Sequence, residues 1–244
     1  MATATAPGLP EIERARERLD GVARVTPVFP SETLSRLARR PASLKAENLQ
    51  RTGSFKIRGA YTKLSNLEPE ELSAGVVAAS AGNHGQAVAW AARELGAPAR
   101  IFMPHYSPMA KFEATLSYGA EVEQTGAVWE ETLEAAVAYV ERTGATFVHP
   151  YEDTFVIAGQ GSIGLEIAEQ IDELETVVIP IGGGGLASGI SLALRAVRAG
   201  LSVAPLSDCY AEPRRARPGV VLGFGSTRPR EIAAAVRRLK DVLR

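Results

Sequence analysis

The stretch VVAASAGNHGQAVAWAARELGAPARIFMP, residues 76–104, decides the fold class. An apolar run, VVAAS at 76–80, is followed by QAVAWAARELG at 86–96, which has helical spacing and ends in glycine, and then by a second apolar run, ARIFMP at 99–104. A buried strand, a helix and another strand in succession form a unit whose strands are parallel. Ligands of such sheets bind beyond the carboxyl ends of the strands.

The same alternation continues on both sides of this stretch. Helices are predicted over 11–24, 107–119, Trp129–Thr143 and 162–171, and extended segments over 120–126, 145–150 and 176–181. Strands and helices that take turns along a chain indicate an α/β fold. The sequence therefore predicts an α/β protein with parallel-rich sheets.

The composition narrows the class of partner. The chain has 244 residues, 45% of them hydrophobic and 23% charged, with a net charge of −1. This balance gives no electrostatic reason to expect nucleic acid or an anionic membrane, so a small molecule is the expected partner. Cys209 is the single cysteine, which excludes an internal disulfide, and the first 20 residues lack the apolar core of a secretion signal. A cytoplasmic location is expected.

One uncharged run could be mistaken for a membrane span. Residues 176–194, TVVIPIGGGGLASGISLAL, contain four consecutive glycines and a proline. A spanning helix needs about 20 apolar residues without such interruptions. A buried strand, a turn and a helix are the favoured interpretation, and no membrane partner is expected.

The glycines of this run form the first candidate site. In IPIGGGGLASG, 179–189, glycines lie between a predicted strand and a helix, where backbone N–H groups and the helix start can hold a phosphate. A dinucleotide fingerprint is also possible, but Ser202 stands where its acidic residue is expected, and no Gly-Lys-Ser/Thr follows for a nucleotide-binding P-loop. Alternatively, the glycines only permit tight packing.

The second candidate site is ASAGNHGQA, 79–87, where polar residues follow a predicted strand. Ser80, Asn83 and His84 lie where a parallel sheet presents its ligands. The amide of Asn83 offers a donor and an acceptor, and a helix start suits a carboxylate. Asn83 could instead simply cap the helix.

The third candidate is Lys56 in RTGSFKIRGA, 51–60. Apolar residues follow it at helical spacing, so Ser54 is expected to cap a helix whose first turn contains Lys56. An amine beside an apolar helix face has a lowered pKa and becomes nucleophilic toward carbonyls. The alternative is an ordinary solvated lysine such as Lys63.

Together, ENLQRTGSFKIRGA at 47–60, SAGNHGQA at 80–87 and PIGGGGLASGI at 180–190 resemble the pyridoxal-phosphate enzymes of fold type II, and most closely the threonine/serine dehydratases, or ammonia-lyases. The resemblance covers about residues 10–198. It implies pyridoxal 5'-phosphate bound covalently through Lys56, with Phe55 beside the ring and Asn83 on the ring hydroxyl. The implied phosphate cradle is Gly182, Gly183, Gly184, Gly185 and the backbone of Leu186, and the implied substrate-carboxylate group is Ser80, Gly82, Asn83 and His84.

The implied reaction is β-elimination of L-threonine or L-serine to a 2-oxo acid and ammonia, with Lys56 as the general base and isoleucine biosynthesis as a possible setting. Serine racemases of this group carry a second acid/base serine where this chain has Ala81, which favours elimination over racemisation. The family also implies a homo-oligomer. No metal is expected, because His84, His105 and His149 lack the spacing of metal ligands.

The resemblance also predicts the domain organisation. Residues 1–52 and 150–198 would form an incomplete large domain, and residues 53–149 a small domain. The tail, 199–244, carries 9 basic and 4 acidic residues and resembles the C-terminal end of aminotransferase-like domains in MocR-type regulators. Two other functions therefore remain open: a cofactor-binding protein without turnover, and a fusion product that folds only in part.

Overall fold

A four-stranded parallel sheet lies at the centre of one part of the molecule. The computed structural model describes residues 6–197 of the chain. Its larger sheet has four strands in the order β5-β4-β3-β6, and every adjacent pair is parallel. The strands are β3 (Val76–Ala79), β4 (Ala99–Met103), β5 (Glu121–Gln124) and β6 (Thr146–Phe147). The predicted α/β class with parallel strands is confirmed.

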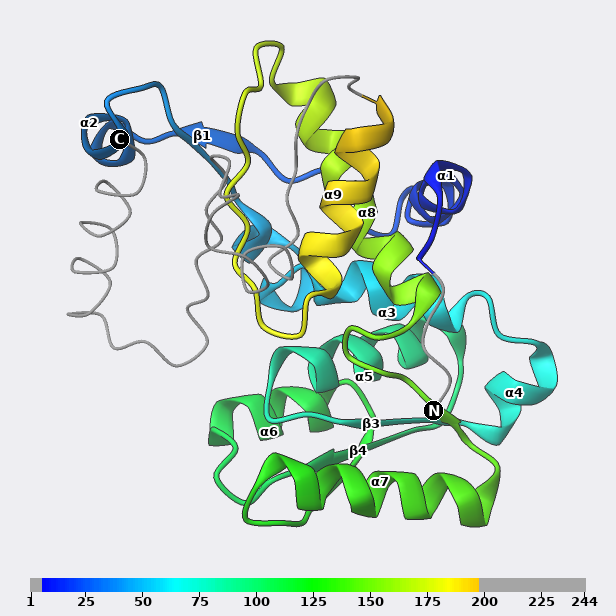
Figure 1. The fold of residues 1–244 in the computed structure, drawn as a ribbon. Coiled ribbons are helices and arrows are strands. Elements are labelled where there is room, and N and C mark those ends of the chain that lie inside the picture. The colour runs from blue at the N-terminus through cyan, green and yellow to red at the C-terminus, as the bar shows by residue number, and fades with distance from the viewer. Residues whose placement is uncertain (1–5, 198–244) are drawn as a thin grey trace, which may run out of the picture.

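Helices connect these strands and cover both faces of the sheet. In Figure 1, α5 and α6 lie on one face and α7 on the other. Their bounds are Asn83–Leu95 for α5, Met109–Ser117 for α6 and Trp129–Thr143 for α7. The helix predicted to end at glycine does so, because Gly96 adopts the left-handed conformation (φ +69°) that ends many helices.

A second group of elements is mainly helical. It contains α1 (Leu9–Arg18), α8 (Thr154–Gln170) and α9 (Gly185–Val197), which pack together. A small antiparallel pair, β1 (Val28–Pro30) with β2 (Ser43–Lys45), flanks α2 (Glu32–Ala38). The remaining elements are the short helices η1 (Glu47–Leu49), η2 (Arg51–Gly53) and α4 (Pro69–Ala74).

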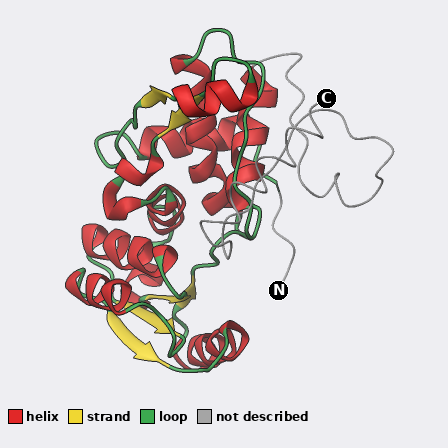
Figure 2. Ribbon diagram, turned by 90° about the vertical axis from the view of Figure 1, so that its left-hand side faces the viewer, coloured by secondary structure: helices red, strands yellow, loops and turns green. Residues whose placement is uncertain are grey.

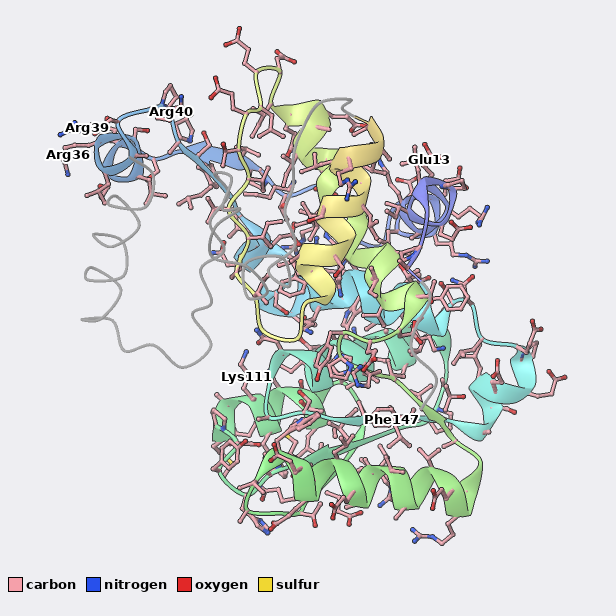
Figure 3. All side chains as sticks on the ribbon, in the orientation of Figure 1. Glu13, Arg36, Arg39, Arg40, Lys111 and Phe147 are labelled. Carbon is pink, nitrogen blue, oxygen red and sulfur yellow. The ribbon has the colours of Figure 1, made fainter. Side chains whose placement is uncertain are left out.

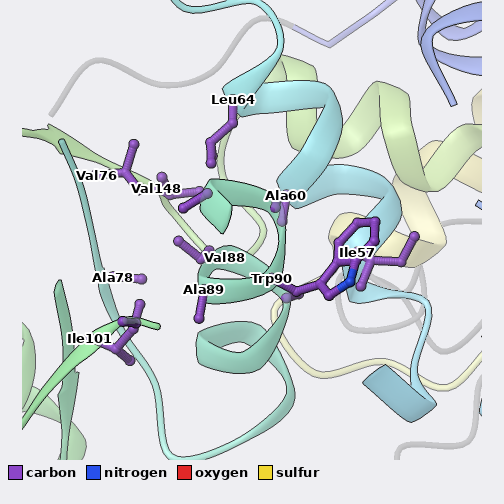
Figure 4. Close-up of a cluster of buried hydrophobic side chains, with 14 of the residues drawn as sticks. Ile57, Ala60, Leu64, Val76, Ala78, Val88, Ala89, Trp90, Ile101 and Val148 are labelled. Carbon is purple, nitrogen blue, oxygen red and sulfur yellow. The ribbon is translucent and has the colours of Figure 1, made fainter. Parts of the chain in front are cut away.

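Helix α3 (Lys56–Leu64) lies between the two groups, as Figures 1 and 2 show. One side of α3 packs on α8 and another on α5. Its buried side chains Ile57 and Leu64 join a cluster with Val88 and Trp90 of α5 and Ile101 of β4, drawn in Figure 4. Burying apolar side chains of this size stabilises the fold by about 1.5–3 kcal/mol each. The helix that begins with Lys56 is thus fixed on two sides.

Glycines bring α8 unusually close to its neighbours. A Cβ on Gly159 would lie 2.5 Å from the carbonyl oxygen of Arg58 in α3, and one on Gly164 would lie 2.8 Å from Cβ of Ala193 in α9. The helix predicted over 162–171 begins earlier in the structure, at Thr154. The glycines explain the difference. Glycine disfavours helix in isolation, but here close packing outweighs that cost.

Three further predictions of local structure were wrong. The helix predicted over 11–24 ends at Arg18, and Gly21 then adopts a positive φ of 68°. The predicted strand over 176–181 is not a strand, because neither of the sheets in the described residues pairs with it. Ser54 does not cap α3: Phe55 takes the N-cap position, and no side chain bonds there.

The structure does not test two of the predictions. The domain boundaries at 52, 149 and 198 stay predictions. The tail from 199 to 244, with Cys209, lies outside the described residues.

Candidate functional site

Lys56 is the first residue of α3, and its amine is turned inward. Nζ donates a hydrogen bond to the carbonyl oxygen of Pro150 at 2.7 Å and lies 5.4 Å from the centre of the Phe55 ring. Burial lowers the pKa of Lys56 to about 8, because the charged form is poorly solvated there. The expectation of a shielded amine with a lowered pKa is therefore met by the local geometry.

The partner of Lys56 leads directly to the glycine loop. Pro150 is followed by Tyr151, and the Tyr151 ring packs against the backbone of Gly183. A Cβ on Gly183 would lie 2.1 Å from this ring, so only glycine fits there. A Cβ on Gly185 would be 3.0 Å from Tyr151. Gly184 has a φ of +91°, which favours glycine, and α9 begins at Gly185. The lysine and the glycine loop are thus joined through a two-residue segment.

That segment follows β6, which pairs with β3, and the residues after β3 form the other side of the site. Ser80 is buried, and its Oγ accepts a hydrogen bond from the N–H of Gly82 at 3.1 Å, which closes a turn before α5. Gly82 is the N-cap of α5. The predicted polar residues therefore follow the carboxyl end of β3, next to the carboxyl end of its parallel neighbour β6.

His84 is fully enclosed beside this turn. Its Nε2 lies 2.8 Å from the carbonyl oxygen of Val148, directly after β6. Burial, with the nearby charge of Lys56, lowers the pKa of His84 to about 3. The ring is therefore neutral near pH 7, and Nε2 must carry the proton because a carbonyl only accepts. The imidazole links the two strand ends, and Nδ1 can only accept a hydrogen bond.

Asn83 is the first residue of α5 and does not cap it through its side chain. Its Oδ1 instead accepts a hydrogen bond from Nζ of Lys111 in α6 at 2.6 Å. The side chain is exposed. The capping alternative for Asn83 is therefore wrong, and the amide remains available at the edge of the site.

Comparison with known proteins shows the family to which the chain belongs. The profile of the family described as "Pyridoxal-phosphate dependent enzyme" matches residues 19–222. This chain belongs to the pyridoxal-phosphate dependent enzyme family. The predicted fold type II resemblance is confirmed at the level of the family.

Curated relatives within the family are ammonia-lyases. The chain is 51% identical over 189 residues to the L-threonine ammonia-lyase of Thermotoga maritima, covering 78% of this chain and 47% of the relative. It is 45% identical over 196 residues to L-threonine dehydratase catabolic TdcB of Staphylococcus aureus, covering 80% of this chain and 57% of the relative. The chain thus spans about half the length of the curated relatives it matches.

Solved structures of the same fold include enzymes of two activities. Maize serine racemase superposes with a TM-score of 0.78 at 36% identity, over 81% of this chain and 60% of that one. The processed form of threonine deaminase isoform 2 from Solanum lycopersicum superposes with a TM-score of 0.72 at 37% identity, over 80% and 55%. The fold alone therefore does not separate elimination from racemisation.

The residues present fit the cofactor of this family. An amine with a lowered pKa suits attachment to an aldehyde, and a glycine loop at the start of a helix suits a phosphate. The buried hydroxyls of Thr52 and Ser54, shortly before Lys56, have no hydrogen-bond partner among the described residues. Buried hydroxyls are costly without a partner, so polar atoms of a ligand would be accommodated there.

A buried ion network holds the helix that carries Lys56. The Arg58 guanidinium contacts Glu47 Oε1 at 2.8 Å and Glu166 Oε1 at 2.6 Å, and Lys45 pairs with the same Glu166. Arg58 is 1% exposed, so both its charge and those of its partners are largely removed from water. Two acids and two bases balance there, which fixes α3 against α8.

Sequence reasoning missed three contributors: Pro150, Tyr151 and Lys111. Pro150 and Tyr151 could have been found, because they follow β6 at the same sheet edge as Ser80 and Asn83. Lys111 gave no such signal, since it lies within α6. Its contact with Asn83 depends on how α6 packs on α5.

Residues 6–197 contain neither a candidate metal site nor a candidate membrane span. Within 6–197 no group of three or more His, Cys, Asp or Glu is arranged to hold a metal ion. No helix in this range is long and apolar enough to cross a membrane.

Proposed function

We propose that this chain is the cofactor-binding part of a pyridoxal-phosphate dependent ammonia-lyase that converts L-threonine or L-serine to a 2-oxo acid and ammonia. The observation that supports it most is the junction at Pro150 and Tyr151, which joins a buried amine of lowered pKa to a glycine loop at a helix start. The names of the relatives, L-threonine ammonia-lyase and L-threonine dehydratase, support the choice of substrate.

Each residue of the site has a role in this proposal. Lys56 binds the cofactor covalently, and Phe55 packs beside the ring. The backbone of the loop holds the phosphate through Gly182, Gly183, Gly184, Gly185 and Leu186. Asn83 contacts the ring hydroxyl. The turn before α5 receives the substrate carboxylate through Ser80, Gly82, Asn83 and His84.

His84 would contact the substrate carboxylate through its backbone N–H and not through its side chain. Its Nε2 is bonded to Val148, and its neutral Nδ1 carries no proton to donate. The N–H groups at the start of α5 are the available donors, because the first turn of a helix leaves them without partners inside the helix. The side chain of His84 ties the start of α5 to the segment after β6 through its hydrogen bond with Val148.

The chemistry divides between cofactor and protein. When bound, pyridoxal phosphate withdraws electrons from the Cα of the amino acid. The substrate amine would displace Lys56 from the cofactor, and the freed Lys56 amine would then take the Cα proton as general base; a pKa near 8 leaves a neutral fraction at neutral to weakly alkaline pH. The β-hydroxyl would leave with a proton as water, and a water molecule would hydrolyse the released enamine to the 2-oxo acid and ammonia. Ala81 supplies no second acid/base hydroxyl in the loop, which favours elimination over racemisation.

The first experiment tests cofactor attachment. The full chain is saturated with pyridoxal phosphate, reduced with borohydride, digested and mapped by mass spectrometry. We expect the reduced adduct on Lys56. Lys63, which lies on the same helix and pairs with Asp153 at 2.9 Å, is an internal control and should stay unmodified. An unmodified Lys56 would refute the proposed site.

The second experiment tests turnover. The loaded chain is given L-threonine, L-serine or D-serine while 2-oxo acid and ammonia are followed, with Lys56→Ala as the control. Product from the L-amino acids in the unchanged chain alone supports the ammonia-lyase. Attachment without product would favour the second candidate, a cofactor-binding protein without turnover, which the coverage of only 47% of the Thermotoga relative makes worth testing.

We further propose that the chain forms a homo-oligomer in the cytoplasm. A single cysteine, Cys209, suits a reducing compartment. Phe29 of β1 and Leu44 of β2 are about half exposed, at 50% and 52%, and offer an apolar contact for a second copy.

A further inference from the structure

Lys111 reaches out of its own helix to the amide of Asn83. Lys111 is near the start of α6, and its Nζ donates to Asn83 Oδ1 at 2.6 Å, although 28 residues separate the two in the sequence. Figure 3 shows Lys111 on the side of α6 that faces the other group of elements. The contact therefore ties α6 to the first residue of α5, at the edge of the candidate site.

The backbone of Lys111 is fixed by hydrogen bonds of its own, independent of the side-chain contact with Asn83. Its N–H donates to the Pro108 carbonyl at 2.8 Å, and its own carbonyl accepts a hydrogen bond from Oγ1 of Thr115 at 2.8 Å. Thr115 is fully buried. A Cβ on Gly82 would lie 4.0 Å from Cγ of Lys111, so the side-chain stem passes beside the turn that precedes α5.

The contact determines which way the Asn83 amide faces. A lysine ammonium has donors only, so the atom of Asn83 that faces it must be the oxygen. The nitrogen, with its two donors, is then directed away from Lys111. Without Lys111 the amide could turn over and present its oxygen instead, since an exposed asparagine has little else to fix its orientation.

We propose that Lys111 is a positioning residue that fixes the Asn83 amide so that Nδ2 donates to the ring-hydroxyl oxygen of pyridoxal phosphate. This inference rests on the proposed function and deepens it. A donor directed at that oxygen favours its ionised form, and an amide oxygen in the same position would repel it. Lys111 thus selects the ionisation state of the ring hydroxyl without touching it.

A double-mutant cycle tests the inference on the full chain. The variants are Lys111→Met, Asn83→Ala and the pair, and the readouts are the dissociation constant of pyridoxal phosphate and its bound absorbance spectrum. We expect Lys111→Met to weaken binding about tenfold, since a hydrogen bond to a charged group is involved. The absorbance should move to shorter wavelength, because a protonated ring hydroxyl absorbs there.

The cycle separates positioning from a direct charge effect. If Lys111 acts through Asn83, Lys111→Met should change affinity less than about twofold when Asn83 is already alanine. Lys111→Arg, which keeps the charge and the donors, should restore both affinity and spectrum. Arg36→Met removes an exposed positive charge from α2 and should change neither.

Several results would overturn the inference. They are additive effects of the two substitutions, an unchanged spectrum in Lys111→Met, or no rescue by arginine. Should Lys111→Met fail to fold by circular dichroism, Lys111→Gln decides the same question, with a smaller shift expected because its amide can also donate. If the unchanged chain binds no pyridoxal phosphate, the proposed function falls and this inference with it, whereas binding with an unaffected Lys111→Met overturns this inference alone.

Discussion

Lys56 shows how one residue acquires its chemistry from its surroundings. Its amine donates to a backbone carbonyl rather than to a carboxylate, so burial is not offset by a negative charge. The pKa falls to about 8 for that reason. An arginine or a solvated lysine at the same position would stay charged and could not act as a nucleophile near neutral pH.

Lys56 should make the stability of the cofactor-free chain depend on pH. The pKa of its amine is about 8 in the folded chain and 10.5 when the side chain is fully solvated, so between these values the unfolded chain binds more protons. The free energy of unfolding should therefore rise with pH across this window, by about 3 kcal/mol at most. Denaturant unfolding at several pH values measures it.

The matched controls for this pH effect lie on the same helix. Lys56→Met should abolish the rise, because methionine has no proton to lose, and Lys63→Met should keep it. A Lys56→Met chain with the same pH profile as the unchanged chain would contradict the prediction.

At the scale of elements, α3 is the helix on which the site depends. It carries Lys56 at its first turn and packs on α5 on one side and α8 on the other. The Arg58 network and the close approach of Gly159 set its distance from α8. Any change that moves α3 should therefore move the amine relative to Pro150.

Removal of Arg58 tests this dependence. Arg58→Met leaves Lys45 paired with the buried Glu166, whereas the partly buried Glu47 loses its positive partner. The free energy of unfolding should fall by about 3–5 kcal/mol, as for other broken buried ion pairs. Chemical denaturation provides the measurement.

An exposed ion pair provides the comparison for Arg58. Arg16→Met removes the pair with Glu169, and both side chains of that pair are largely exposed. It should cost less than about 1 kcal/mol, because water screens the interaction. Equal losses in the two variants would show that the buried network does not hold α3.

At the scale of the whole molecule, two exposed apolar side chains lie side by side on the β1–β2 pair. Phe29 and Leu44 are directly opposite each other in the antiparallel register, so their side chains share one face. Both are about half exposed. A short two-stranded ribbon with such a face is stabilised when another surface covers it.

Self-association should weaken when this face becomes charged. Leu44→Lys is expected to raise the dimer dissociation constant about tenfold or more, because an ammonium would be buried without a partner. Sedimentation equilibrium measures the constant. Leu116→Lys, at a similarly exposed site on α6, is the control and should leave it unchanged. A monomeric unchanged chain, or equal effects of both substitutions, would contradict the prediction.

Much of the local structure was predictable because it depends on neighbours in the sequence. The span of α7 from Trp129 to Thr143 follows from its apolar spacing, and the end of α5 at Gly96 from the left-handed conformation that glycine accepts. The start of α8 was not predictable in this way. Its glycines disfavour helix locally and are accommodated only because α3 and α9 pack against them.

Periodicity and residue chemistry are local properties, so the parallel α/β class and the three stretches that carry Lys56, Asn83 and the glycines can be inferred from the amino-acid sequence. Three contacts of the site cannot be inferred in this way: Pro150 with the Lys56 amine, Tyr151 with the glycine loop, and Lys111 with Asn83. These partners are distant in sequence and meet only when strands and helices pack. The lowered pKa of Lys56 also arises only in the folded chain, because burial of the amine is its cause.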